Sequence, residues 1–298
     1  MDIADIKAAL NKPTLSESSK KTYASIIKNL MSNMGITNPK DLLKSRKVLT
    51  YLKPKTANHR KTTLSAVITF LSCLGYETHN AVKKYRSLVK KDNLIVDDKE
   101  KEQAKSDDEI INGKSWDKIN SIYDGMTKRY KNFDKNGDDL TMKDLQGIQD
   151  YIIATIYIKQ KPRRLMDYTE LKIKDVDKDT DNYINRGNFV FNKYKTQKKY
   201  STQKVKIEPD VKKILNKWIK IIPDNISYLL FDNNSNKLNS VKLNQRLKKI
   251  FGFSANMIRS AFLTDMYKDA PSLKNAEDTA TDMGHSVATA IKHYVKLD

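Results

Sequence analysis

The chain has 298 residues, of which 39% are hydrophobic and 31% are charged, a balance typical of globular proteins with a sizeable core. Its longest nearly apolar run, from Ala66 to Tyr76, is too short for a membrane span, which needs about 20 residues, and the start of the chain lacks the basic and then apolar pattern of a secretion signal. The net charge of +20 favours polyanionic partners, with nucleic acid ahead of an anionic membrane surface.

Charge divides the chain into three segments. Residues 1–92 hold 18 basic and 6 acidic side chains, residues 93–112 hold 3 and 7, and residues 113–298 hold 35 and 23. We therefore expect two basic domains separated by an acidic joint. The joint has little to bury and is interpreted as a solvated linker, with an exposed charged helix as the alternative. Two basic domains on either side of such a joint suit a clamp that closes around a DNA duplex.

The first domain, residues 1–92, is predicted to be helical. Apolar residues recur with a 3.6-residue period from Tyr23 to Met31, behind serines that can cap a helix. Pro39 can begin a second helix, and a third apolar stripe runs from Leu64 to Leu74 and stops near Gly75. A basic cluster precedes this third helix and is interpreted as a surface that follows DNA phosphates, with an ordinary solvated helix face as the alternative. The cluster consists of Lys53, Lys55, Arg60 and Lys61.

The second domain, residues 113–298, has a mixed pattern. The apolar segment Tyr151–Ile158 predicts a buried helix. Two short segments, Asn188–Asn192 and Val205–Ile207, alternate between apolar and polar residues and contain enough β-branched residues to be strands. The strongly basic segment Lys193–Lys204 predicts a hairpin between them. Helical patterns return in the last third of the chain.

Residues that can carry chemistry occur in order along the second domain. They are Arg164 and Asp167 in Arg164-Leu165-Met166-Asp167, Lys195 in Lys195-Thr196-Gln197-Lys198, Asn256 and Arg259 in Asn256-Met257-Ile258-Arg259, His285 in Gly284-His285-Ser286, and Tyr294, nine positions after His285. Two guanidinium groups can hold the oxygens of a phosphodiester in fixed geometry while a tyrosine attacks the phosphorus. That tyrosine, with an ordinary pKa of about 10, needs positive charge and a proton acceptor beside it. A lysine on a hairpin can give the departing 5′-hydroxyl its proton.

The same motifs resemble those of the tyrosine recombinase/integrase family, and the resemblance covers roughly residues 150–298. In that family an arginine is followed three residues later by an acid, and then by a run of the form Leu-x-aromatic/aliphatic-x-Asp-hydrophobic-Asp. Alignment of Leu171 and Asp175 with this run makes Arg164, rather than Arg163, the catalytic match.

Other positions follow from the same alignment. Asp167 fills the acid position, and the resemblance implies that it orients the catalytic arginine. Asn256 stands where the family has a histidine; an amide can donate a hydrogen bond to the phosphate but cannot exchange protons, so we expect slower chemistry. Ser286 is expected to cap the short helix that presents Tyr294. Tyr267 is the alternative nucleophile, but it precedes the Gly-His turn and fits the pattern less well.

The resemblance implies a mainly α fold with a small antiparallel β-sheet, in which a helical, SAM-like core-binding domain precedes an α+β catalytic domain. The catalytic residues that it implies are Arg164, Lys195, Asn256, Arg259, His285 and Tyr294, supported by Asp167. Further basic residues of this domain are expected to contact DNA: Arg163, Lys193, Lys198 and Lys199. The three lysines of this set are also rivals of Lys195 for the role of general acid. No metal or cofactor is expected, because one cysteine and four scattered histidines form no zinc-ligand set.

The function implied is that of a site-specific recombinase or integrase, from a virus or mobile element, acting inside the cell or in the virion. It would cleave and rejoin double-stranded DNA without a metal, through a 3′-phosphotyrosyl intermediate. The family works as a homotetramer on two DNA sites, and we expect a monomer or dimer without DNA. A type IB topoisomerase, which uses similar chemistry, and a DNA-binding protein that has lost cleavage are the alternatives.

Overall fold

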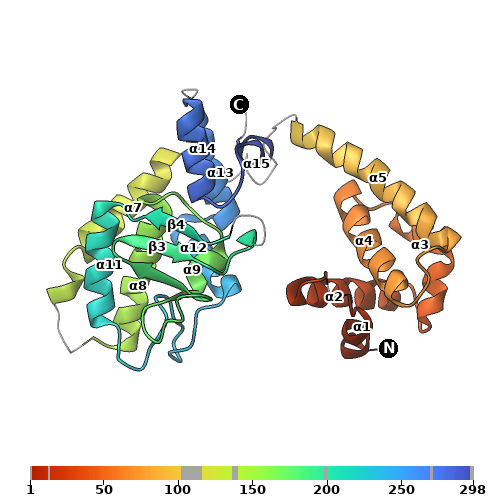
Figure 1. The fold of residues 1–298 in the computed structure, drawn as a ribbon, viewed down its shortest axis with the longest axis horizontal. Helices are drawn as coiled ribbons and strands as arrows, with labels where there is room; N and C mark the ends of the chain where they lie inside the picture. Colours follow the sequence, from red (N-terminus) through yellow and green to blue (C-terminus); the bar gives the residue numbers. More distant parts are fainter. Residues whose placement is uncertain are drawn as a thin grey trace. The chain divides into compact units, whose positions relative to one another are not determined.

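The computed structural model describes residues 2–12, 14–101, 116–135, 140–197, 201–268 and 271–295. The chain forms two compact units, Met1–Glu102 and Gln103–Asp298, shown in Figure 1. Helices predominate in both units, and a single four-stranded sheet is present in the described part of the second. The predicted fold class, mainly α with a small sheet, is therefore confirmed.

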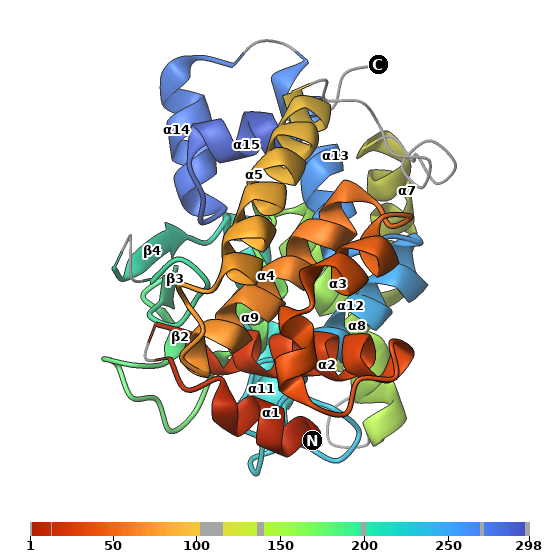
Figure 2. The same ribbon diagram turned by 90° about the vertical axis from the view of Figure 1, so that its right-hand side faces the viewer.

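The first unit is helical in the described residues, as predicted. Its elements are α1 (Ile3–Ala9), α2 (Glu17–Asn33), the 3-10 helix η1 (Pro39–Leu43), α3 (Ser45–Leu52), α4 (Ala57–Cys73) and α5 (Asn80–Lys101). The expected serine cap is present, because the Ser16 side chain accepts a hydrogen bond from the backbone of Ser19 at the start of α2. Figures 1 and 2 both show α4 lying along α5, and side chains such as Leu64, Phe70 and Tyr85 are buried in this unit's core.

The acidic joint differs from the prediction in its first part. Helix α5 continues without a break to Lys101, so residues 93–101 are helical rather than a solvated linker. No glycine or proline interrupts the sequence from Asn80 to Lys101, and Leu94 and Ile95 are exposed on this helix. The rest of the predicted joint, up to residue 112, lies outside the described residues.

The second unit combines helices with the sheet. Its elements are α7 (Trp116–Tyr130), η2 (Phe133–Lys135), α8 (Met142–Ile158), α9 (Leu165–Thr169), β1 (Leu171–Lys172), β2 (Asn182–Asn185), β3 (Asn188–Phe191), β4 (Gln203–Lys206), α11 (Pro209–Ile221), α12 (Ser240–Phe251), α13 (Ala255–Tyr267), α14 (Leu273–Asp282) and α15 (Val287–His293). The segment predicted as a buried helix is the second half of α8, and its residues from Tyr151 to Ile158 are all buried.

The sheet has the strand order β1-β2-β3-β4. Strands β2, β3 and β4 are antiparallel, and the pairing of Phe189 with Val205 joins the two strands that the sequence predicted. Strand β1 pairs with β2 in parallel, so the sheet is mixed rather than wholly antiparallel. The predicted hairpin is confirmed in that β3 and β4 are directly paired antiparallel neighbours.

The core of the second unit forms around α8. Figure 1 shows α7 and α11 beside this helix. Tyr168 packs edge to face against Phe189 of β3, and Trp218 of α11 stacks on Phe231. The Tyr168 contact fixes α9 against the sheet, and the segment just before α9 is thereby held in place.

Helices α13, α14 and α15 lie together in both views (Figures 1 and 2). A small apolar cluster joins them, consisting of Leu263, Met283, Ala290 and Val295. None of the helices that the structure describes is both long and apolar enough to cross a membrane.

Candidate functional site

An extended segment between α8 and α9, the 161–164 strap, contacts α13 and the end of α14. Pro162 disfavours helical backbone at the residue before it, and the backbone at Arg164 is extended (φ −70°, ψ 153°). Each of the four strap residues makes one hydrogen bond or ion pair to α13, to the end of α14 or to the turn that follows it. Lys161 Nζ pairs with Asp282 Oδ2 at 2.8 Å, the Pro162 carbonyl accepts from Arg259 Nε at 3.3 Å, Arg163 Nη1 donates to the Asp282 carbonyl at 2.5 Å, and Arg164 Nη1 donates to the Gly284 carbonyl at 2.7 Å.

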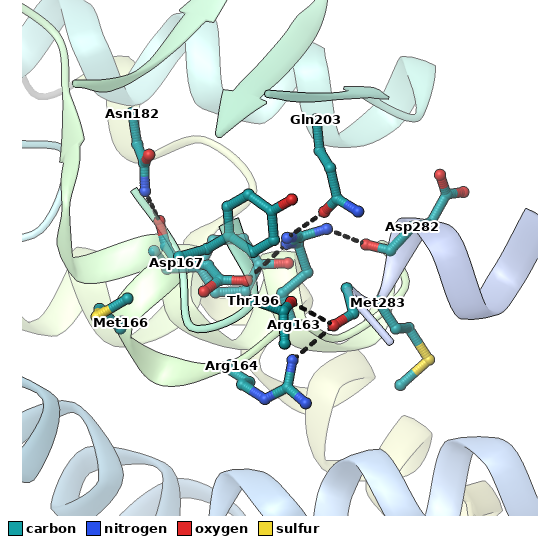
Figure 3. A network of polar contacts seen from close by, with 12 residues as sticks. Arg163, Arg164, Met166, Asp167, Asn182, Thr196, Gln203, Asp282 and Met283 are labelled. Carbon is teal, nitrogen blue, oxygen red and sulfur yellow. Dashed lines mark hydrogen bonds and ion pairs between the residues drawn. The ribbon is translucent and has the colours of Figure 1, made fainter. Parts of the chain in front are cut away.

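Arg164 lies half-buried at the N-terminal end of α9. Figure 3 shows its guanidinium turned towards the carbonyl that follows Met283, which is the Gly284 carbonyl. The Thr196 hydroxyl donates to the same oxygen at 3.2 Å. Within the described part of the chain, the Arg164 guanidinium donates to the Gly284 carbonyl alone, so most of its five N–H donors are available for a ligand.

Arg259 contacts Tyr294 directly. Nη1 of Arg259 donates to the Tyr294 hydroxyl at 2.6 Å, and the guanidinium carbon lies 4.4 Å from the centre of the tyrosine ring. The Arg259 side chain is fully buried in α13, and its Nη2 donates to the Met283 carbonyl at 3.4 Å. Burial lowers the pKa of Arg259, while the phenol of Tyr294 opposes this. A guanidinium stays protonated at neutral pH even so, which places a positive charge beside the Tyr294 hydroxyl.

Local structure fixes the position of Tyr294 at the end of α15. The Ser286 side chain caps this helix by accepting from the backbone of Thr289, as the sequence predicted. The Tyr294 carbonyl accepts hydrogen bonds from Ser260 Oγ at 2.6 Å and Thr264 Oγ1 at 3.3 Å, both on α13. The nucleophile candidate is therefore tied to the helix that carries Arg259.

His285 stacks on the Tyr294 ring, with 5.5 Å between ring centres and 22° between planes. Burial, together with the nearby Arg259 and Arg164, lowers the pKa of His285 to about 3, so the imidazole is neutral at pH 7. Its Nδ1 lies 3.2 Å from the Ser286 carbonyl, which can only accept, so Nδ1 carries the hydrogen. Nε2 is buried without a partner in the described residues, and its lone pair is left to accept a proton or a hydrogen bond.

Tyr267, the alternative nucleophile, has a different environment. Its hydroxyl is buried without a hydrogen-bond partner in the described residues, and burial raises its pKa. Both changes make a phenol less nucleophilic at neutral pH. Of the two tyrosines, Tyr294 is the one beside a guanidinium and an imidazole.

Two predictions about Arg163 and Asp167 are wrong. Arg163, expected on DNA or at the surface, is 1% exposed and covers the ring of Phe191 at 4.1 Å. Asp167, expected to orient Arg164, instead pairs with Arg163 through Nε and Oδ2 at 2.8 Å. The spacing of four residues lets the two side chains meet across the first turn of α9. Burial raises the pKa of Asp167, and Arg163 opposes that rise.

The basic hairpin is described only in its first part. Lys195 is exposed next to Thr196, whose hydroxyl reaches Gly284, but no contact joins Lys195 itself to the arginines or to Tyr294. Lys193 is exposed and paired with Glu170 at 3.0 Å. The other two predicted lysines, Lys198 and Lys199, lie outside the described residues.

Asn256 is exposed on α13, one helical turn before Arg259. The structure thus brings together Arg164, Arg259, His285 and Tyr294, while Asn256 and Lys195 are exposed. Within the described residues, no group of three or more His, Cys, Asp or Glu side chains could hold a metal ion.

The first unit has a basic groove of about 690 Å³. Its charged lining residues are Arg46, Lys53, Arg60 and Lys84. Lys53 belongs to the predicted cluster, while Arg46 and Lys84 were missed. The spacing of Arg46, Thr50 and Lys53 at four and three residues, one face of a helix, is the signal that could have found the first of them.

The rest of the predicted cluster divides into two kinds. Lys55 is exposed and Lys61 half-buried, so both remain available to a ligand. Arg60 instead binds Asp92 of α5, whose side chain is fully buried, and its Nη1 donates to the Lys55 carbonyl at 2.6 Å. The interpretation of Arg60 as a free phosphate contact is corrected: its charge compensates a buried carboxylate, which would be strongly destabilised alone.

No protein-family model and no curated protein matches the sequence. Solved structures do match. A lambda integrase (75–356) dimer bound to a COC′ core site is 14% identical with a TM-score of 0.56, and the match covers 98% of this chain and 93% of that one. A lambda integrase tetramer bound to a Holliday junction is 14% identical with a TM-score of 0.54, over 99% and 76%. XerA recombinase is 12% identical with a TM-score of 0.42, over 100% and 95%. The chain therefore has the fold of lambda integrase, a tyrosine recombinase, as its motifs led us to expect.

Proposed function

We propose that this chain is a site-specific DNA recombinase that cleaves and rejoins strands through a 3′-phosphotyrosyl intermediate. One observation carries the proposal: the Tyr294 hydroxyl lies 2.6 Å from Nη1 of Arg259 and its ring stacks on His285. Arg164 joins the same site through the Gly284 carbonyl, one residue before His285. A phenol in such surroundings is better suited to act as a nucleophile than a surface tyrosine, because guanidinium groups bind both a phosphate and a phenolate.

The arginines supply the charge that the transition state needs. Attack on phosphorus places extra negative charge on the non-bridging oxygens, and donors already fixed in place stabilise it without reorganising. Arg259 is held by the Pro162 and Met283 carbonyls, and Arg164 by Gly284. Both keep N–H groups for the phosphate in a clamp that needs no divalent cation.

The tyrosine loses its proton as it attacks. The Tyr294 oxygen forms a bond to phosphorus while the bond to the 5′-oxygen breaks, and the phenolic proton passes to an acceptor. Neutral His285, whose Nε2 has no partner among the described residues, either binds the phosphate or takes this proton once the anionic phosphate offsets the two arginines that lower its pKa. Attack by a 5′-hydroxyl on the phosphotyrosine reverses the step and reseals DNA.

Lys195 is our candidate for the acid that protonates the leaving 5′-oxygen. It is exposed, and its neighbour Thr196 is bonded to the Gly284 turn. Lys193 is a weaker candidate because Glu170 already holds its ammonium group. Asn256, exposed one turn before Arg259, would donate a hydrogen bond to the bound phosphate.

Double-stranded DNA is the proposed partner. The groove of the first unit offers Arg46, Lys53 and Lys84 to the phosphates, and the net charge of +20 supports attraction over a distance. Lambda integrase is a dimer on its core site and a tetramer on a Holliday junction in the structures named above, and we extend tetrameric assembly to this chain. DNA binding and tetrameric assembly are the properties that an integrase of a virus or mobile element needs, and we propose that origin for this chain.

A DNA substrate nicked just beyond its target phosphodiester tests the proposal, because the short 5′-end diffuses away and traps the covalent adduct. We expect adduct with the chain, in the presence of EDTA, and none with Tyr294→Phe. Tyr267→Phe is the matched control, since it removes a neighbouring phenol of the same apolar cluster. Adduct that persists in Tyr294→Phe, or its absence from the unaltered chain on DNA that it binds, would contradict the proposal.

The same assay separates the alternatives. A type IB topoisomerase would relax supercoiled plasmid that lacks any target site, whereas a recombinase would join two target sites. A DNA-binding protein that had lost cleavage would bind the nicked duplex without forming adduct.

A further inference from the structure

Arg163 is a buried cation near the candidate site that the mechanism above does not use. Its Nε donates to Asp167 Oδ2 at 2.8 Å, its Nη2 donates to Gln203 Oε1 at 2.8 Å, and its Nη1 donates to the Asp282 carbonyl at 2.5 Å. The guanidinium covers the Phe191 ring at 4.1 Å. Figure 3 shows these polar partners, Asp167, Gln203 and Asp282, converging on Arg163, so one side chain joins α9, β4 and the end of α14.

The turn after α14 rests on this guanidinium. Gly284 has a φ of +74°, and a β-carbon at that position would lie 3.0 Å from Nη2 of Arg163 and 3.6 Å from Nη1 of Arg164. Position 284 therefore needs glycine both for its backbone conformation and for the close approach of two arginines. The Gly284 carbonyl in turn receives Arg164 and Thr196, and His285 follows directly.

We propose that Arg163 is a positioning residue, which fixes the Gly284 turn and through it the directions of Arg164 and His285. This inference rests on the proposed function for its catalytic consequence. A direct role on the phosphate does not fit, because the charge of Arg163 is compensated by the Asp167 carboxylate and its three nitrogen atoms donate to Asp167, Gln203 and the Asp282 carbonyl. The equally buried Arg259 instead directs Nη1 at the Tyr294 hydroxyl. A lysine would carry the same charge but could not present the planar set of donors that reaches three acceptors at once.

The test compares Arg163→Lys with Arg164→Ala in single-turnover adduct formation. We expect Arg163→Lys to slow the reaction by roughly 100-fold, because a small displacement of clamping groups has effects of that size. Duplex affinity should stay within about threefold of the unaltered chain. Arg246→Lys is the matched control: it alters another half-buried arginine that pairs with an aspartate, Asp150, in the same unit. Its adduct rate should stay unchanged.

A neutral substrate distinguishes positioning from clamping. A methylphosphonate at the target position lacks the negative oxygen that a clamp residue neutralises, so it should restore adduct formation to Arg164→Ala. Arg163→Lys should not be restored, because Arg163 does not touch the phosphate. Restoration of Arg163→Lys to the same extent would make Arg163 a clamp residue and overturn the proposal.

Hydrogen exchange provides a readout that does not depend on activity. The Gly284 and His285 amides donate to the Thr281 and Ala280 carbonyls at 2.9 and 3.0 Å. Arg163→Lys should speed exchange in a peptide that spans the Gly284 turn, and Arg246→Lys should not. Unchanged exchange in that peptide would refute the positioning role, whereas lack of adduct in the unaltered chain would refute the proposed function alone.

A second variant covers the case in which Arg163→Lys fails to fold. Gln203→Met removes one acceptor from Arg163 at nearly constant volume and leaves its ion pair with Asp167 intact. The same three measurements apply, and we expect roughly tenfold slower adduct formation, the effect of one hydrogen bond to a charged group. A normal rate and normal exchange in Gln203→Met would contradict the proposal.

Discussion

Residues 1–92 and residues 113–298 each carry an excess of 12 positive charges, but they hold their cations differently. In the first region, Lys53 and Lys55 are exposed, and Lys53 lines an open groove. In the second, the two proposed clamp arginines are held by defined partners: Arg259 is 0% exposed and contacts Tyr294, and Arg164 is half-buried and bound to the Gly284 carbonyl. Exposed lysines suit attraction to a phosphate backbone in many registers, whereas buried guanidinium groups suit one phosphate in one geometry.

This contrast implies that the first region supplies affinity for DNA and the second supplies the chemistry. Arg259→Ala is the variant that tests this division most severely. We expect adduct formation to fall about 1000-fold, the upper range for loss of one donor to a charged transition state. Duplex affinity, measured by fluorescence anisotropy, should be nearly unaffected. If affinity fell in parallel with the rate, Arg259 would be an anchor for DNA, and the two regions would not differ as we describe.

Lys195→Ala sharpens the chemical half of the comparison. We expect adduct formation to slow by about 100-fold, the usual contribution of a general acid. A substrate with sulfur in place of the 5′-bridging oxygen should restore the rate, because a thiolate leaves without a proton. Lys193→Ala, which removes a lysine already paired with Glu170, is the control and should have little effect. Failure of the sulfur substrate to restore Lys195→Ala would exclude the lysine as the acid.

The buried histidine predicts a pH dependence that the exposed groove lacks. The pKa of His285 is lowered to about 3, so its neutral form stabilises the folded state fully above the unfolded-state pKa of about 6.5. This stability is lost as pH falls from 6.5 towards 3, because the unfolded state then takes up a proton that the folded state does not. The loss amounts to about 2 kcal/mol at pH 5. Between pH 7.5 and pH 5, the chain should lose about 2 kcal/mol more unfolding free energy than His285→Gln.

Tryptophan fluorescence can measure this difference in the right part of the molecule. Both tryptophans, Trp116 and Trp218, belong to the second unit, so denaturant titrations followed by their emission report on the unit that contains His285. Equal losses of stability in His285→Gln and the unaltered chain would mean that the imidazole is solvated in the folded state.

The smallest effect is expected in the groove of the first unit. The double variant Lys53→Gln, Lys84→Gln should weaken duplex binding about tenfold and reduce the slope of log affinity against log salt by about two. The rate of adduct formation at saturating DNA should not change. Lys21→Gln, Lys40→Gln alters two exposed lysines elsewhere in the unit and is the matched control. Equal losses in both double variants would show that net charge matters more than the groove.

The sequence predicted those features that depend on local pattern. Apolar periodicity located α2, α4 and α8, and alternation with β-branched residues located β3 and β4. These patterns missed β1 and β2, which are two and four residues long. Strand β1 is too short to show a pattern of its own, and β2 pairs with β3 through the two-residue turn Arg186-Gly187, a local signal that could have located it. The sequence also predicted a linker where α5 continues, because charge alone does not show whether an exposed segment stays helical.

The motifs predicted which residues would meet, but not how their neighbours would be arranged. Arg163 and Arg164 are adjacent and chemically identical, and only contacts from β4 and α14 make one of them buried and leave the other half-buried. The same holds for Arg60, whose partner Asp92 is 32 residues away. Such pairings are tertiary, so neither composition nor spacing reveals them.

Mass spectrometry of the trapped protein–DNA adduct tests the central claim most directly. After digestion of both components, the account predicts a nucleotide joined through its 3′-phosphate to the peptide that contains Tyr294, with no other peptide modified. A 3′-phosphate attached to Tyr267 or to another side chain, or an adduct joined through the 5′-phosphate, would contradict it.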